Sequence, residues 1–468
     1  MDSTPALGSG NTDHVPITPE GKRAVWAGAI GSLLEMYDFA LFGAATALVF
    51  SPLFFTSVSP SAAILASFAT FAVGILARPI GAVAISHFGD KVGRKPALIA
   101  TILLMGVATS MIGLLPTYSQ VGIWAPVLLV VCRLLQGIGA GAEFSGSITF
   151  IVEHAPRRQR TYYSSFGAAA FAMGIALATL TFLAVSWMPE DAFLSYGWRI
   201  PFLFGAVIFV VAYLIRKNLT ETPAFVAAEE KADEERKHKL PIVELFRERG
   251  GNVFYGTVAL TSIHATSYIL STYALTYIAK TLGMPSWVGL TATTIATVLA
   301  AILIPQFGKL GDIYGAHRVM AAGALFGAAA VIPYFLLLDT RQPALIIAAT
   351  ALAYSIGYSA MVAGHGAFLA RLFDTRTRYT GISVTRELNS SIIGSTAPLI
   401  AAFLVQINNG SPWWLATYLI AAGVVSLIAI VMATRQSRSA MFDDDMSNIR
   451  SSTPAATGPT SPENMTVA

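Results

Sequence analysis

The 468-residue chain has little charge and almost no cysteine. Only 12% of its residues are charged and 54% are hydrophobic, whereas about 25% of an ordinary soluble domain is charged. This composition excludes a soluble protein of two or three domains and predicts an all-α polytopic membrane protein. The single Cys132 excludes an internal disulfide, so the fold does not depend on an oxidising compartment.

Motifs that mark enzymes are also absent from the sequence. It has no Gly-rich phosphate-binding loop, no metal-spaced cluster of His, Cys, Asp and Glu, and no nucleophile elbow. We therefore expect no enzyme activity, no metal and no cofactor. The formal net charge of +4 does not indicate a nucleic-acid partner, because the places of the basic residues along the chain explain it. Residues 1–22 are polar, unlike a cleavable signal peptide, so the first membrane helix is expected to direct insertion.

Apolar runs long enough to cross a bilayer dominate the chain. A crossing helix needs about 20 such residues. Reading for these runs predicts twelve membrane helices, at 24–50, 62–87, 96–116, 122–150, 162–187, 198–218, 252–281, 286–310, 317–338, 343–371, 378–407 and 412–434. Glycines inside them, such as Gly137, are tolerated where a neighbouring helix packs closely.

Lys and Arg are distributed unevenly over the connections between these helices. Of 30 such residues, 24 fall in one set of alternate connections, and the other set holds only Arg199, Lys280 and Arg341. Cytoplasmic connections carry the excess of positive charge. Both termini are therefore predicted to be cytoplasmic, in a multi-pass protein of the cell or inner membrane, and an even number of helices is required.

Hydrophilic sequence divides the chain into two six-helix bundles, predicted at 23–218 and 252–434. The charged residues 219–251 between them are expected to form a cytoplasmic linker. Residues 1–22 and 435–468 are polar and are expected to be disordered cytoplasmic ends.

A short motif occurs once in each half. The run GDKVGRK at 89–95 follows the second predicted helix, and GDIYGAHR at 311–318 follows the eighth. The repetition predicts two halves in a pseudo-twofold, parallel repeat, which is typical of a rocking transporter. The first run resembles the cytoplasmic loop signature of the major facilitator superfamily.

Further motifs resemble the metabolite:H⁺ symporter family of that superfamily. They are GSLLEMYDF at 31–39, RPIG at 78–81, RLLQG at 133–137, GAEFSG at 141–146, YGWRIPF at 196–202, ETPAF at 221–225, RYTG at 378–381 and APLIA at 397–401. The resemblance implies proton-coupled uptake by rocker-switch alternating access, as in shikimate, α-ketoglutarate, citrate and proline-betaine symporters. The expected partners are a small organic acid or zwitterion, protons and the lipid bilayer, and a monomer is expected.

Three arginines, Arg78, Arg133 and Arg386, fall deep inside predicted membrane helices. A charge there is costly unless it is partnered, so these residues indicate a polar pathway and favour an anionic or zwitterionic cargo. For Arg78, substrate contact and packing at a gate both stay open. Arg133 can hold a carboxylate, and the resemblance links an arginine at this place to proton transfer; a fixed salt bridge is the alternative. Gln136, one turn further, is expected to line the same cavity.

Carboxyl groups occur in the same apolar sequence. Glu35 and Asp38 are three residues apart, so they share a face of the first helix, and Glu35 lies about 16 Å from its start. Either one is a candidate proton carrier, and a structural ion pair or hydrogen bond is the alternative. Arg386 and Glu387 are adjacent and point about 100° apart. We therefore expect each to find a partner elsewhere, in the substrate or in the first half of the chain.

Two histidines lie in the predicted membrane helices of the second half. His264 is mid-depth, where a near-neutral imidazole suits a proton relay, with a structural hydrogen bond as the alternative. His365 is expected to be structural.

Charged residues at the cytoplasmic mouth are expected to form a gate. The resemblance and their positions imply that they hold the halves together in one state and separate in the other; the alternative is that they only set the topology. The gate candidates are Asp90, Arg94, Glu143, Glu153, Arg160 and Asp312.

Two other functions can be weighed against symport. A drug or metabolite:H⁺ antiporter on the same fold usually has a Gly-Pro-rich motif in its fifth helix, whereas residues 166–174 read FGAAAFAMG, without proline. A non-transporting membrane sensor is the third alternative, and no sequence feature favours it.

Overall fold

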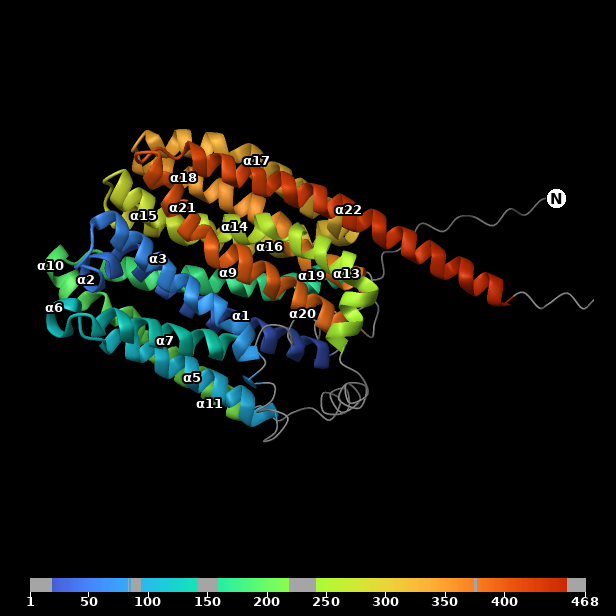
Figure 1. Ribbon diagram of the computed structural model, residues 1–468, viewed down its shortest axis with the longest axis horizontal. Helices are drawn as coiled ribbons and strands as arrows, with labels where there is room; N and C mark the ends of the chain where they lie inside the picture. The colour runs from blue at the N-terminus through green and yellow to red at the C-terminus, as the bar shows by residue number, and fades with distance from the viewer. Residues whose placement is uncertain are drawn as a thin grey trace, which may run out of the picture.

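The computed structural model describes residues 19–82, 84–85, 94–141, 159–218, 241–373 and 377–452, and every regular element in these ranges is a helix. The long helices lie side by side in one bundle, and α22 extends beyond it (Figure 1). Over the described part of the chain, the all-α fold predicted from the composition is confirmed.

Residues before 219 supply what we call the N-terminal group of helices. Its long members are α1 (Pro19–Ala45), α3 (Pro60–Leu76), α5 (Arg94–Leu114), α7 (Trp124–Ala140), α9 (Arg160–Val185) and α11 (Arg199–Asn218). Shorter elements extend or connect them: η1 (Thr46–Phe50), α2 (Ser51–Phe54), α6 (Tyr118–Val121), α10 (Glu190–Ala192) and η3 (Phe193–Gly197).

Residues after 240 supply the C-terminal group. One continuous path comprises α13 (Pro241–Ala259), α14 (Thr261–Tyr268), η4 (Ile269–Tyr273), α15 (Ala274–Thr276) and η5 (Tyr277–Thr281). It is followed by α16 (Ser286–Tyr314), α17 (Ala316–Asp339), α18 (Pro343–Leu352), η6 (Ala353–Tyr358), α19 (Ser359–Leu372), α20 (Arg378–Asn389), η7 (Ser390–Gly394), α21 (Ser395–Ile407) and α22 (Trp413–Ser452).

Most of the predicted crossings coincide with apolar helices. Within the described ranges, nine helices are long and apolar enough to cross a membrane, and Ile99–Leu114 and Trp124–Ala140 are shorter apolar helices. These match eleven of the twelve predicted runs. The remaining run, 252–281, is helical but divided by a turn at Leu260, and it is rich in Ser, Thr and Tyr.

Three helices extend past the boundaries expected from the sequence. α1 begins at Pro19, inside the expected disordered end, and α13 begins at Pro241, inside the expected linker. Proline is well suited to the first position of a helix because its missing N–H would have no partner there. α22 continues to Ser452 instead of ending at 434, since no Gly or Pro interrupts the sequence before Pro454. Residues 1–18, 219–240 and 453–468 lie outside the described ranges.

The two groups of helices meet along α9 and along α3. α9 packs against α1 on one side and against α16 on the other, while α3 packs against α21. Aromatic rings from the two groups touch where α3 faces the path from α14 to η4: Phe68 lies 5.8 Å from Tyr273, and Phe71 lies 5.8 Å from Tyr268, between ring centres. The centre of the bundle is therefore built from both groups.

Glycines let α7 approach the chain of α3 backbone to backbone. A Cβ on Gly137 would lie 2.1 Å from the carbonyl oxygen of Gly74, and one on Gly141 would lie 2.0 Å from that of Arg78. Such distances exclude any side chain at either position. The close approach brings Arg78 and Arg133 to neighbouring places at the centre of the bundle.

Replacing Gly137 with alanine is therefore expected to destabilise the fold, by about 1–3 kcal/mol as for an overpacked core. The matched control is Gly167→Ala in α9, where a Cβ would meet no atom within 4 Å and alanine favours the helix. Thermal unfolding of both purified variants in detergent measures the difference. Equal unfolding temperatures would contradict the close packing of α3 and α7.

Candidate functional site

A buried ion pair joins α1 to the chain after α3. The guanidinium of Arg78 donates a hydrogen bond from Nη2 to Oε1 of Glu35, and both side chains are only 1% exposed. Nε of Arg78 also lies 3.8 Å from Oε2 of Glu387 in α20. Breaking a buried ion pair is strongly destabilising because it leaves a charge without compensation. Arg78 therefore links the N-terminal group to the C-terminal group.

Asp38 is fully buried among uncharged hydrogen-bond donors. Its Oδ1 accepts a hydrogen bond from Nε2 of Gln136 at 2.7 Å and contacts the hydroxyl of Thr109. The other end of the amide, Oε1 of Gln136, accepts from Nη1 of Arg133 at 3.2 Å. Because an arginine only donates, this contact fixes the orientation of the amide. Gln136 thereby connects the carboxyl group to the guanidinium.

Three phenylalanine rings enclose the guanidinium of Arg133. Its Cζ lies 4.3 Å from the ring centre of Phe39, 4.1 Å from that of Phe42 and 5.1 Å from that of Phe71. A cation against the faces of aromatic rings is stabilised by their quadrupoles, most when water is excluded. Gly74 leaves room for the arginine, since a Cβ there would lie 2.3 Å from its Nε. The cage holds the positive charge in one place.

The expectation that Arg386 and Glu387 would not pair with each other is wrong. Nη1 of Arg386 donates to Oε1 of Glu387 at 2.8 Å. The 100° separation describes only the directions in which the two Cβ atoms leave the helix. Both side chains are long, so rotation about their bonds beyond Cβ can bring the charged ends together. The expectation of a partner in the first half holds for Glu387, which faces Arg78. Alternating charges thus run from Glu35 through Arg78 and Glu387 to Arg386.

His264 in α14 is attached to α20. Its Nδ1 lies 2.7 Å from Oδ1 of Asn389. The ring of Tyr268 stacks on the imidazole, with 6.2 Å between ring centres and 14° between planes. The same tyrosine meets Phe71 of α3. His264 and Tyr268 therefore lie next to the boundary between the two groups of helices.

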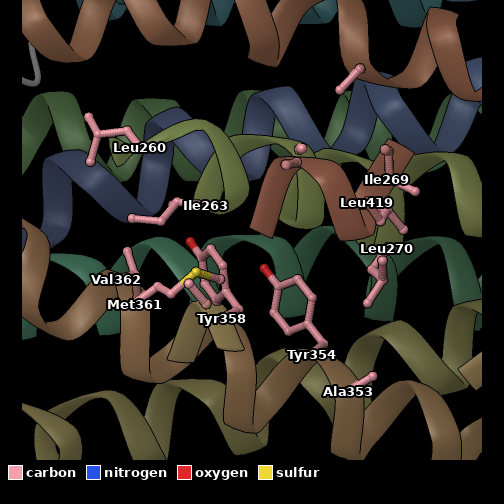
Figure 2. Packing of buried hydrophobic residues seen from close by; sticks show 14 of the residues in the cluster. Leu260, Ile263, Ile269, Leu270, Ala353, Tyr354, Tyr358, Met361, Val362 and Leu419 are labelled. Carbon is pink, nitrogen blue, oxygen red and sulfur yellow. The ribbon is translucent and has the colours of Figure 1, made fainter. Parts of the chain in front are cut away.

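Two tyrosines of η6 belong to the buried apolar cluster of the C-terminal group. The rings of Tyr354 and Tyr358 stack, with centres 4.7 Å apart and planes at 25°. Figure 2 shows them side by side, with both hydroxyl ends on the side where Ile263 lies. On the same helical path, Nδ1 of His365 lies 2.5 Å from the carbonyl oxygen of Val362. This bond within its own helix suits the structural role expected of His365.

The structure brings most of the predicted cavity residues into one charged cluster between α1, α3, α7 and α20. They are Glu35, Asp38, Arg78, Arg133, Gln136, Arg386 and Glu387, with His264 attached beside them. Of the gate candidates, Asp90, Glu143, Glu153 and the side chain of Arg94 lie outside the described residues. Arg160 is the first residue of α9.

The remaining gate candidate, Asp312, joins the two groups of helices. Its carboxylate in α16 accepts hydrogen bonds from the backbone N–H groups of Thr161 at 2.9 Å and Tyr162 at 3.0 Å, at the start of α9. A helix N-terminus attracts a carboxylate through its free N–H groups and its dipole. At the other end of the same helices, Trp187 and Trp287 stack with ring centres 6.2 Å apart. α9 and α16 are therefore held together at both ends.

Comparison with known proteins identifies the family. Residues 28–385 and 259–443 match the profile of the Major Facilitator Superfamily. The chain belongs to the major facilitator superfamily. Over 440 residues it is 34% identical to the Shikimate transporter of Escherichia coli (strain K12), covering 93% of this chain and 100% of that one. Over 438 residues it is 35% identical to the Inner membrane metabolite transport protein YhjE of the same organism, covering 92% and 98%.

The superfamily fold is also found in solved structures. The crystal structure of a D-xylose-proton symporter matches this chain with a TM-score of 0.66, covering 87% of this chain and 96% of that one at 19% identity. At that identity the likeness shows the fold alone. Together with the sequence relatives, it confirms the family prediction: this superfamily member is a multi-pass membrane protein that transports metabolites, and it is not an enzyme.

Sequence reasoning missed several residues that contact the charged cluster or His264. Thr109 and Asn389 are polar side chains in apolar helices, a weak signal that could have drawn attention to them. Tyr268 and the phenylalanines around Arg133 give no signal of this kind, because aromatic residues are common in membrane helices. Only their positions in space reveal their roles.

The ion pair between Glu35 and Arg78 predicts non-additive effects on stability. Arg78→Leu is expected to cost about 3–5 kcal/mol, because it leaves Glu35 buried without this partner. The double variant Glu35→Leu/Arg78→Leu is expected to cost less than Arg78→Leu alone. Unfolding free energies of the two single variants and the double variant form a double-mutant cycle, and additive losses would show that the pair contributes no coupling.

Proposed function

We propose that this transporter is a proton-coupled symporter that imports a small carboxylate metabolite. The observation that carries the proposal is the balance of charge in the buried cluster. Three side chains are permanently positive and three can be negative: Arg78, Arg133 and Arg386, and Glu35, Asp38 and Glu387. With all six ionised, the charges sum to zero, so a bound carboxylate would leave a net buried negative charge, which is costly. A proton that enters with the carboxylate restores the balance.

Asp38 is the carboxyl group best suited to carry that proton. Its partners Gln136 and Thr109 are uncharged, so they can hydrogen-bond to either form of the acid. Glu35 instead faces Arg78 directly, and an opposite charge at contact distance favours the ionised form.

The hydrogen bonds around Thr109 can adapt to either form of Asp38. Oγ1 of Thr109 lies 2.7 Å from the carbonyl oxygen of Met105, the usual partner of a threonine in a helix. It also accepts from Nε2 of Gln136 at 3.0 Å. A hydroxyl has one proton to donate. Thr109 can donate it to an ionised Asp38, or donate it to Met105 and accept the proton of a protonated Asp38.

A protonated Asp38 gives the cluster a net charge of +1, which favours the arrival of an anion. The carboxylate then neutralises the cluster, and proton and substrate can move together. A zwitterion would not relieve the positive charge in this way, so the charge balance favours a carboxylate. The 34% identity to a shikimate transporter supports the same class of substrate, and Arg386 is the proposed contact for the carboxylate.

The proposed transport cycle uses the contacts between the two groups of helices as gates. The cycle has twelve crossing helices with both termini in the cytoplasm, as the positive-inside rule supports, and the bacterial relatives support an inner-membrane location. In this arrangement, the bond from Asp312 to the start of α9 closes the cytoplasmic side, with Arg160 beside it, and the Trp187–Trp287 stack closes the outer side. The cycle needs no cofactor, because the proton gradient supplies the energy, and one chain contains the whole pathway.

Uptake into proteoliposomes tests the proposal. With an acidic exterior, labelled shikimate or another acid from a panel that includes α-ketoglutarate and citrate is expected to accumulate, and a protonophore is expected to abolish the accumulation. A monocarboxylate that enters with one proton carries no net charge, so a potassium–valinomycin potential should leave its initial rate unchanged.

The variant Asp38→Asn separates coupling from binding. It is expected to lose accumulation driven by the pH gradient while it still exchanges internal for external substrate. Accumulation by the wild-type protein that ignores the pH gradient would contradict symport. Potential-dependent uptake of proline or betaine, with no uptake of acids, would show that the substrate is a zwitterion and not a carboxylate.

A further inference from the structure

The side-chain amide of Asn389 has a single orientation that satisfies its neighbours. Its Nδ2 donates to the backbone carbonyl oxygen of Thr257 at 2.7 Å and to the hydroxyl of Thr261 at 3.2 Å. A carbonyl oxygen only accepts hydrogen bonds, so the nitrogen of the amide must face Thr257. The amide oxygen, Oδ1, therefore faces His264.

That orientation determines the tautomer of His264. Oδ1 of Asn389 only accepts, so Nδ1 of His264, 2.7 Å away, carries the ring proton. The partner at Nδ1 is an uncharged amide, and the neutral imidazole satisfies this contact. In the neutral imidazole that results, Nε2 holds a lone pair and is an acceptor.

This acceptor is unused within the described part of the protein. The recorded contacts of His264 are the bond from Nδ1 to Asn389 and the stack of Tyr268 against its face, and neither involves Nε2. His264 nevertheless keeps 9% of its surface exposed. Asn389 faces the Nδ1 edge and Tyr268 lies against one face of the ring, so the Nε2 edge has no recorded contact.

The acceptor lies near an arginine of the charged cluster. Arg386 and Asn389 are three residues apart in α20, so their side chains leave the helix on the same face. His264 is bonded to Asn389 and is within reach of the charge on Arg386. A guanidinium and a hydrogen-bond acceptor on one face can bind a molecule that has both a carboxylate and a hydroxyl group.

We propose that Nε2 of His264 accepts a hydrogen bond from a hydroxyl group of the transported acid, so that the transporter selects hydroxylated carboxylates over their deoxy analogues. This inference rests on the proposed function, because it assigns the hydroxyl contact of the same substrate. A deoxy analogue would bury the acceptor without a partner and lose the net contribution of one hydrogen bond, about a five- to tenfold loss of affinity.

Matched pairs of acids test the proposal on the purified full-length protein. The probes are malate and succinate, lactate and propionate, and quinate and cyclohexanecarboxylate, and the readout is the affinity ratio within each pair. In the wild type, the hydroxylated member of any pair that binds is expected to be preferred about five- to tenfold. A general loss of folding or of binding affects both members equally, so the ratio isolates the hydroxyl contact.

Two substitutions of His264 distinguish the roles of its two ring nitrogens. His264→Asn retains an N–H near the place of Nδ1 and removes Nε2, so the preference is expected to fall to about onefold. His264→Gln offers an amide oxygen near the place of Nε2 and is expected to retain a preference. His365→Asn is the control, because it alters the other buried histidine near Arg386, and the wild-type ratio is expected.

Several outcomes would overturn the inference. Acids that bind without a hydroxyl preference, or a preference that survives His264→Asn, would exclude the contact while leaving symport intact. If His365→Asn loses the hydroxyl preference to the same extent, the preference cannot be assigned to His264. Failure of every acid to bind would refute the proposed function and this inference with it.

Independently, ¹⁵N NMR of histidine-labelled protein should show an unprotonated Nε2 in the signal that His264→Gln removes, and a protonated Nε2 would contradict the tautomer.

Discussion

The structure depends on keeping six ionisable side chains balanced in the interior of a membrane protein. Three arginines and three carboxyl groups meet where the two groups of helices touch, and an unpaired charge there would cost several kcal/mol. Each arginine is stabilised by its own set of contacts. Arg78 lies between Glu35 and Glu387, Arg386 pairs with Glu387, and Arg133 is enclosed by aromatic rings. These contacts tie helices from both ends of the chain together.

The packing of the helices determines where the charged residues meet. Glycines let α7 approach α3 closely enough to bring Arg133 and Arg78 together, and Gly74 leaves the space that the Arg133 side chain fills. α9 joins α1 to α16, so the two groups are connected beside the cluster and also at both ends. Because the charges are shared across this boundary, the proton and the anion of the proposed symport would alter the attraction between the groups. Such a change in attraction is what the proposed transport cycle requires to couple binding to movement.

Much of the fold could be predicted from the sequence because its signals are strong. Long apolar runs predict the membrane helices, and Arg78, Arg133 and Arg386 stand out as charges in apolar sequence. Their partners could not be predicted, since Gln136 reaches Asp38 across 98 positions and Asn389 reaches His264 across 125. The pairing of Arg386 with Glu387 could not be predicted either, because the backbone gives only the directions of their Cβ atoms. α22 continues beyond 434, where the polar composition predicts disorder, and α13 begins before 252, inside the predicted linker.

Proton uptake on substrate binding tests the central claim most directly. The purified protein is held in a weakly buffered solution with a pH indicator, at a pH where Asp38 is partly ionised, and the transported acid is added as its pre-equilibrated salt. The account predicts the uptake of up to one proton per bound carboxylate, and none in the Asp38→Asn variant. Binding of the carboxylate with no proton uptake at any pH, or with the same uptake in the variant, would contradict the balance of buried charge on which the account rests.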